Sequence, residues 1–301
     1  MILKRNYVHT GHDQEEVREL GLELFNLTAN YTDIQQYIAG FIPTHWHRHM
    51  EIFILLSGQV QVGIRENVYD LIPGEGCFIN AEVLHSFKAC GTSPCLFRSF
   101  VFDPTIVSGM PGSIFDVKYV RPLIHSGREY LKFSPDSDQI FFEKFALAFQ
   151  ACAEEFPGYE FHVRNALTDI LLYIQSICSV SSVSQSASGI WEIRIKEMLQ
   201  WIEQNLCKNI TVNEIASAAN ICPRECQRVF QRYVHYSPME YLRLKRILMA
   251  AELLSTTDSS VIDIALECGF SGSSYFSKQF KLLTGSTPTE YRKAVHDQTN
   301  N

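Results

Sequence analysis

The sequence has no apolar run approaching the roughly 20 residues that a helix needs to cross a bilayer. Its first segment, Met1 to Arg18, is polar and lacks the charged and then apolar pattern of a secretory signal peptide. The nine cysteines are an odd number, with no C-x-x-C pair and no regular spacing. These absences argue against a membrane protein and a disulfide-bonded secreted protein, and they favour a cytoplasmic location with reduced thiols.

An excess of positive charge is also missing, because 26 Lys and Arg stand against 33 Asp and Glu, a net charge of −7. That balance by itself argues weakly against a nucleic-acid binder. The acidic excess is confined to residues 1–189, which hold 13 Lys and Arg against 21 Asp and Glu, whereas residues 190–301 hold 13 against 12. Since phosphate contacts need cations on one face only, the second part can still bind DNA.

The 301 residues are enough for two ordinary domains. Residues 179–189 are rich in Ser and uncharged, which predicts a flexible linker. We expect a sensing domain over residues 1–136, a helical dimerisation segment over 137–178 and a DNA-binding domain over 190–301. The expected fold class is therefore an α+β multidomain protein.

Short strands are predicted from about Ile34 to Phe102. Residues 59–65 alternate strictly, with Val60, Val62 and Ile64 on one face. Further strands are expected at 51–57, 76–79, 85–87 and 96–102, with turn residues between them. Many short strands of this kind favour a sandwich or barrel. Residues 137–178 have a helical period and predict two helices, whose apolar stripe packs either on this barrel or on a second copy of the chain.

Residues 211–233 have the pattern of a helix-turn-helix unit. Thr211 to Glu214 is a capping box, Asn220 suits a left-handed turn, and Pro223 suits the first position of the next helix. The residues expected on the exposed face of that helix are Arg224, Gln227, Arg228, Gln231 and Arg232. Arg and Gln can pair with guanine and adenine edges. The alternative is the solvated face of an ordinary helical bundle.

The same pattern repeats 50 residues later, which favours DNA binding over the ordinary bundle. Ser260 caps a helix, Gly269 is a turn residue, and a second candidate reading helix runs from about Ser273 to Leu283. Its residues expected to face inward are Tyr275, Phe276 and Phe280, and those expected to face outward are Ser273, Ser274, Ser277, Lys278 and Lys281. A stiff helix over residues 238–255 would place the two reading helices in successive major grooves, roughly 34 Å apart.

Residues 195–293 resemble the AraC/XylS family of transcription regulators. The motifs that carry the resemblance are KRILMAAELL at 245–254, VIDIALECGF at 261–270, YFSKQF at 275–280 and GSTP at 285–288. This long, gapped pattern with special Gly and Pro positions is specific. Cys222 departs from it by standing where a capping Ser is usual, and Cys226 stands where Leu is usual. Both changes predict a less stable first unit.

The resemblance implies base contacts by residues of both reading helices. They are Arg224, Gln227 and Arg228 in the first, and Ser273, Ser274 and Lys278 in the second. Arg232 is a further candidate for DNA contact, and Lys281 is expected to contact phosphate. The implied partners are double-stranded DNA, a small-molecule effector, RNA polymerase and a second copy of the chain, with no membrane.

The spacing H-x-H-x3-E-x6-G, which begins at His45, looks like the first cupin motif, and His85 falls in a version of the second. In metal-binding cupins the groups corresponding to His45, His47, Glu51 and His85 close on one divalent ion. Imidazole and carboxylate suit Zn, Fe, Ni or Mn. His49 alternates with His45 and His47, so we expect it on the same face.

Three interpretations of these side chains stay open: a metal site, a metal-free pocket that uses them for hydrogen bonds, and a packed core. The cofactor is therefore undetermined. We expect a sequence-specific transcription regulator, and not an enzyme, whose barrel senses a small molecule and controls DNA binding or activation. The alternatives are a regulator controlled by a partner protein and a metal-dependent cupin enzyme fused to a DNA-binding module.

Overall fold

The computed structural model describes residues 2–3, 25–178 and 189–299, which belong to two compact units. Residues 2–3 and 25–178 make up the first unit, and residues 189–299 make up the second. The predicted linker, residues 179–189, lies outside the described residues except for Gly189, which begins the first helix of the second unit. None of the described helices is both long enough and apolar enough to span a membrane.

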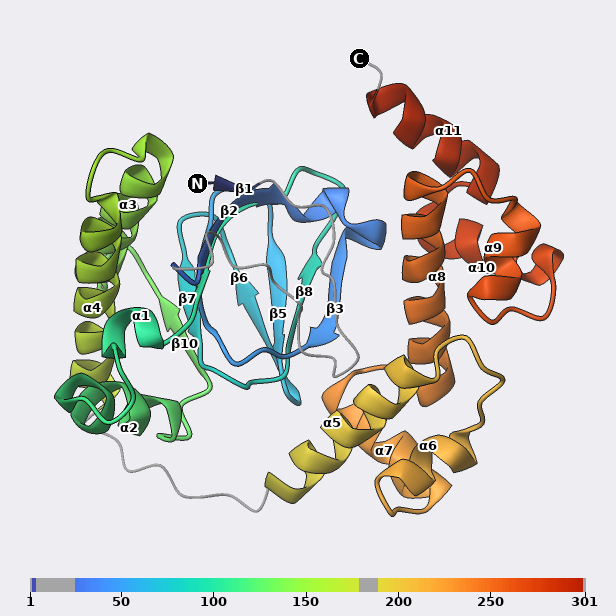
Figure 1. The fold of residues 1–301 in the computed structure, drawn as a ribbon, viewed down its shortest axis with the longest axis horizontal. Coiled ribbons are helices and arrows are strands. Elements are labelled where there is room, and N and C mark those ends of the chain that lie inside the picture. The colour runs from blue at the N-terminus through green and yellow to red at the C-terminus, as the bar shows by residue number, and fades with distance from the viewer. Residues whose placement is uncertain (1, 4–24, 179–188, 300–301) are drawn as a thin grey trace. The chain divides into compact units, whose positions relative to one another are not determined.

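Two sheets form the first unit (Figure 1). The six-stranded sheet has the order β1 (Ile2–Leu3), β2 (Leu27–Asp33), β9 (Leu96–Phe102), β4 (Met50–Leu55), β7 (Gly76–Ile79) and β10 (Tyr130–Phe133). The four-stranded sheet has the order β3 (Phe41–His45), β8 (His85–Ala89), β5 (Val60–Ile64) and β6 (Asn67–Leu71). Apart from β1 and β2, the paired strands are antiparallel.

The predicted barrel is corrected to a pair of facing sheets. A closed barrel gives every strand two neighbours, but in the described part of the chain no strand of one sheet pairs with a strand of the other. The sheets are held together by a shared core that includes Phe53 and Phe97 from one sheet and Val60, Val62 and Phe87 from the other. The predicted alternation of β5 is confirmed, because Val60, Val62 and Ile64 are all buried.

The other face of the six-stranded sheet packs on two helices, α3 (Gln139–Glu154) and α4 (Tyr159–Cys178), as Figure 1 shows. Phe141 stacks on Phe133 of β10, with ring centroids 4.1 Å apart, and Phe145 meets Phe100 of β9. The apolar stripe of these helices therefore packs on the sheet of its own chain, which was one of the two interpretations left open. The shorter helical segments of this unit are η1 (Ile34–Gln36), η2 (Ile38–Gly40), α1 (Thr105–Ser108), η3 (Asp116–Val120) and α2 (Arg121–Ile124).

The described residues of the second unit are all helical or in connections between helices. The helices are α5 (Gly189–Gln204), α6 (Val212–Ala218), α7 (Pro223–Tyr233), α8 (Pro238–Thr256), α9 (Val261–Glu267), α10 (Ser273–Thr284) and α11 (Pro288–Thr299). The 19-residue helix α8 contacts both helix pairs, and Figure 1 shows it running from α6 and α7 at one end toward α9 and α10 at the other. At 1.5 Å per residue it is about 28 Å long.

Local capping sets these helix boundaries, as the sequence predicts. Thr211 and Glu214 form the capping box of α6, and Asn220 has a positive φ of 53° in the following turn. Gly269 takes φ 80° between α9 and α10, where a Cβ would lie 2.9 Å from the carbonyl oxygen of Cys207. One expectation for α10 is wrong: Tyr275 is 48% exposed, because only Phe276 and Phe280 reach the core.

Candidate functional site

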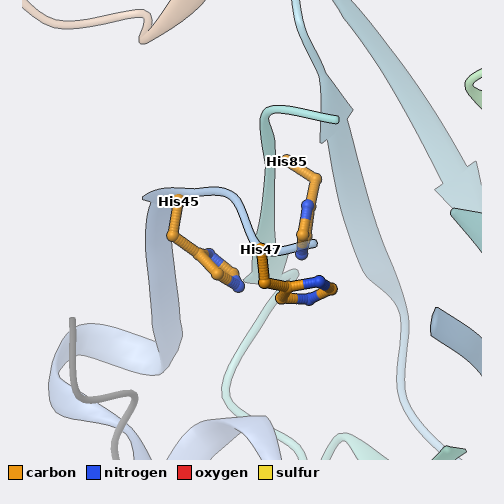
Figure 2. A group of neighbouring side chains, drawn as sticks. All are labelled: His45, His47 and His85. Carbon is orange, nitrogen blue, oxygen red and sulfur yellow. The ribbon is translucent and has the colours of Figure 1, made fainter. Parts of the chain in front are cut away.

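Four residues of the cupin-like motif meet between the two sheets of the first unit. His45 ends β3 and His85 begins β8, and these two residues are direct cross-strand partners. Glu51 comes from β4 of the opposite sheet, and His47 lies in the connection between β3 and β4. All four are buried, with at most 3% of the residue exposed. Figure 2 shows the three imidazole rings turned toward one another.

Backbone carbonyls fix the orientation of all three rings. The Nδ1 atom of His45 lies 2.8 Å from the carbonyl oxygen of Pro43, and the Nδ1 atom of His85 lies 2.8 Å from that of Val83. The Nδ1 atom of His47 lies 2.9 Å from the carbonyl oxygen of His49. A carbonyl oxygen only accepts, so each Nδ1 must carry the proton and donate it. In the neutral imidazole the lone pair is then on Nε2.

The ligand atoms of His45, His47 and His85 lie within 4.8 Å of one another. The Oε2 atom of Glu51 is 3.5 Å from Nε2 of His47 and 3.5 Å from Nε2 of His85. A carboxylate oxygen facing two acceptor nitrogens at that distance is repulsive in a buried site unless positive charge lies between them. A proton shared between the carboxylate and a ring, or a bound metal ion, would remove that repulsion.

Burial lowers the pKa of His45 well below its ordinary value, and the neighbouring His85 and His47 lower it further. His45 is therefore a neutral ring at physiological pH. Burial, followed by the charge of Glu51, raises the pKa of the Cys77 thiol well above its ordinary range. Cys77 therefore stays a thiol and adds no negative charge to the site.

The donor set fits a divalent metal ion. Ligand atoms about 2.1 Å from a tetrahedrally bound ion are about 3.4 Å apart. Glu51 lies 3.5 Å from His47 and from His85, and the ligand atoms of the three rings lie within 4.8 Å of one another, so small side-chain shifts would complete the site. Metal-binding histidines usually donate their other ring N–H to a carbonyl or carboxylate, as all three rings do here. Three nitrogens and one oxygen suit Zn, Fe, Ni or Mn.

His49 does not join this group, although its alternation with His45 and His47 predicted that it would. Strand β3 ends at His45, so the period of two residues does not continue to His49. The residue is half-buried, with its ring 5.7 Å from that of His47. Its backbone carbonyl oxygen takes part instead, by accepting a hydrogen bond from Nδ1 of His47.

The second candidate site is the exposed face of α7. Arg224, Gln227, Arg228 and Arg232 are all exposed, on the side opposite the buried residues of the same helix. Those buried residues include Cys226, Val229, Phe230 and Tyr233. As the sequence predicts, Pro223 is the first residue of the helix, and Cys222 at the N-cap forms no side-chain capping bond.

The corresponding face of α10 carries Ser274, Lys278 and Lys281, all of them exposed, and Ser273, which is half-buried. Phe276 and Phe280 anchor the opposite face in the core. The two helices thus offer side chains suited to base edges and phosphates from one unit, with α8 between them.

Sequence reasoning missed the surroundings of Arg228. Its guanidinium forms hydrogen bonds to Glu225, and it lies 5.1 Å from the ring centroid of Trp191 in α5. Arg194 lies over the same indole, at 4.8 Å. The spacing of Glu225 and Arg228 on one helix could have suggested their ion pair. Trp191 is 37 positions away in the sequence, and only the fold brings it to α7.

Two helix-turn-helix units joined by one long helix define a DNA-binding protein, and its other unit holds the buried polar cluster. A family described as an AraC-like ligand binding domain matches residues 31–160, and a helix-turn-helix domain family matches residues 215–294. The chain belongs to the AraC family of transcription regulators. It is a DNA-binding transcription regulator with an amino-terminal ligand-binding domain.

Two curated relatives are similar over most of the chain, and a third is similar over about a third of it. The HTH-type transcriptional regulator YdeC of Bacillus subtilis is 27% identical over 87% of this chain and 90% of that protein. The melibiose operon regulatory protein of Escherichia coli is 25% identical over 84% of each. The HTH-type transcriptional activator AarP of Providencia stuartii is 41% identical over 33% of this chain and 73% of that protein.

Proposed function

We propose that the ligand-binding unit of this regulator holds one divalent transition-metal ion through His45, His47 and His85, with Glu51 as a fourth ligand. The observation that carries the proposal is that Nδ1 of each ring forms a hydrogen bond with a backbone carbonyl oxygen. One ligand atom of each ring lies within 4.8 Å of the others, and the buried carboxylate of Glu51 lies 3.5 Å from two of the rings. A bound ion would supply a positive centre for an anionic or oxygen-bearing effector.

Metal analysis of the full-length protein tests this proposal. We expect about one bound Zn, Fe, Ni or Mn per chain after purification without chelator, with the site saturable by added Zn²⁺. His47→Ala should lower the metal content at least tenfold, whereas His49→Ala is the matched control and should keep it. A wild-type chain that takes up no metal and melts at the same temperature with and without Zn²⁺ would contradict the proposal.

We further propose that the exposed faces of α7 and α10 contact DNA. The proposed contacts are Arg224, Gln227, Arg228 and Arg232 on α7, and Ser273, Ser274, Lys278 and Lys281 on α10. Support comes from the exposure of seven of these side chains, all except the half-buried Ser273, and from the contacts of α7 and α10 with the α8 connector. Arg228→Ala should cost about 1–3 kcal/mol at the preferred site. An equal loss of affinity for random DNA would show that Arg228 contacts the DNA phosphate backbone and not a base.

The remaining elements of the proposal concern assembly and location. We propose a cytoplasmic, non-catalytic regulator that works as a homodimer with RNA polymerase as a partner; the relatives named above are regulators too. Residues 137–178 are the proposed dimer contact, because the outer faces of α3 and α4 leave Leu147 57% and Phe161 68% exposed. Analytical ultracentrifugation tests the dimer, and replacing both residues by Ser should shift the protein to monomer.

A further inference from the structure

The Arg228 side chain is held by two groups from different helices. Its Nη2 and Nε atoms donate to Oε2 of Glu225 over 2.6 Å and 3.1 Å, and its guanidinium lies 5.1 Å from the ring centroid of Trp191. The side chain is still 52% exposed, so the guanidinium is oriented and yet accessible. Cation–π contact and an ion pair together restrict a side chain that otherwise has many rotamers.

Glu225 differs from the residues at the same position of the other capped helices. The third residue of α6, α8 and α11 is a Glu that turns back to the N-cap. These pairs are Thr211 with Glu214, Ser237 with Glu240 and Thr287 with Glu290. At α7 the N-cap is Cys222, which forms no capping bond, and the carboxylate of Glu225 binds Arg228 instead.

The ion pair with Glu225 leaves N–H donors of the Arg228 guanidinium available for contact with a base. Arginine has five N–H donors, and Glu225 engages one on Nε and one on Nη2. The remaining three donors include the end-on pair of Nη1 and Nη2, which is the pair that recognises O6 and N7 of guanine. The carboxylate also offsets the charge of Arg228, which weakens attraction to phosphate of any sequence and favours contact with a base.

We infer that Trp191 and Glu225 are positioning residues that set the base specificity of Arg228, and that this arrangement depends on the weak N-cap at Cys222. A side chain already held in its bound conformation loses less freedom on docking, so its contribution to specific binding is larger. The inference rests on the proposed contact between Arg228 and a base.

Base preference measured on full-length protein tests the inference. The wild type and five variants, Arg228→Ala, Trp191→Ala, Trp191→Phe, Glu225→Gln and Ile193→Ala, are each equilibrated with a pool of randomised DNA duplexes, and the bound fraction is sequenced. Ile193, which lies two residues after Trp191 in α5 and is 60% exposed, supplies the matched control. Thermal melting of each variant reports whether the fold is kept.

Arg228→Ala should abolish the preference at one or two base pairs. Trp191→Ala and Glu225→Gln should lower the preference at those same base pairs about two- to fivefold, as expected for loss of a partly exposed cation–π or ionic contact. The other positions should be unaffected, Trp191→Phe should retain most of the preference, and Ile193→Ala should match the wild type.

Failure of the inference and failure of the proposed DNA contact are distinguishable. If Arg228→Ala removes a base preference that Trp191→Ala and Glu225→Gln both leave intact, only the positioning role is overturned. A uniform loss at all positions in Trp191→Ala would show a structural role for the indole and would also overturn it. If Arg228→Ala changes no preference, the proposed base contact of Arg228 is wrong, and the inference falls with it.

Discussion

Replacing Cys222 by Ser should stabilise the DNA-binding unit and weaken its sequence preference at the same time. The backbone at Cys222 already has the N-cap conformation, with φ −78° and ψ 157°, nearly the same as φ −71° and ψ 158° at Ser237. Ser237 accepts a hydrogen bond from the backbone N–H of Glu240. A hydroxyl in place of the Cys222 thiol can accept the equivalent bond without any backbone change.

The size of the gain follows from N-cap measurements on other helices. A good N-cap contributes about 1 kcal/mol relative to a residue that does not cap, within a range of about 0.5–2 kcal/mol. For a domain of about 100 residues, each kcal/mol raises the melting temperature by about 4–8 °C. A new cap would also attract Glu225 into a capping box, as at Ser237 and Glu240, and so release Arg228.

Calorimetry and base-preference sequencing on the full-length protein would measure the two effects. Cys222→Ala is the control that should leave stability nearly unchanged, and Ser237→Ala should lower the same thermal transition by a similar amount. A Cys222→Ser protein that melts no higher than Cys222→Ala would refute the capping argument. One that melts higher but keeps its full preference at the Arg228 base pair would show that Glu225 stays with Arg228.

Three further predictions concern other parts of the chain. Gly76→Ala should destabilise the ligand-binding unit by about 1–3 kcal/mol in urea unfolding, because the added Cβ would lie 2.7 Å from Phe141 and 2.9 Å from the Phe53 carbonyl oxygen; an unchanged midpoint would contradict this. Ser237 holds the pKa of Glu240 below its ordinary value, so this contribution to stability is present at neutral pH and is lost as the pH falls through the lowered pKa. In the Glu240→Gln variant the free energy of unfolding should therefore fall less steeply with decreasing pH than in the wild type. If stability falls equally steeply with pH in both proteins, Glu240 does not make this contribution. Lys281→Ala should weaken binding to all DNA sequences alike and lower the salt slope by about one; a sequence-dependent effect would argue against a phosphate contact.

Helix boundaries in the second unit could be predicted from the sequence because short-range chemistry sets them. Thr211, Ser237 and Ser260 each accept a backbone N–H three residues later, so a local pattern is enough to locate the helix start. The exposed face of α7 followed in the same way from the period of its buried residues. The exposure of Tyr275 could not be predicted in this way, because no local pattern distinguishes this aromatic residue from the adjacent Phe276, which is buried.

Strands were harder to predict where they bury polar groups. Strand β2 lies outside the region assigned to strands, because Thr28, Asn30 and Thr32 make it look like a surface segment. All three are buried, and Asn30 donates to Ser99 of the neighbouring β9 over 3.1 Å. Such a strand is stable only with its partner present, so its own residues do not identify it.

The sequence by itself determined the α+β class, the two helix-turn-helix units and the cupin-like spacing of His45, His47 and Glu51. Tertiary structure decided that the strands form two facing sheets, that β8 pairs His85 with His45, and that His49 stays outside the cluster. It also brought Trp191 to Arg228. Caps and periodic stripes depend on residues three or four positions apart, whereas these contacts depend on how distant segments pack, which no local pattern encodes.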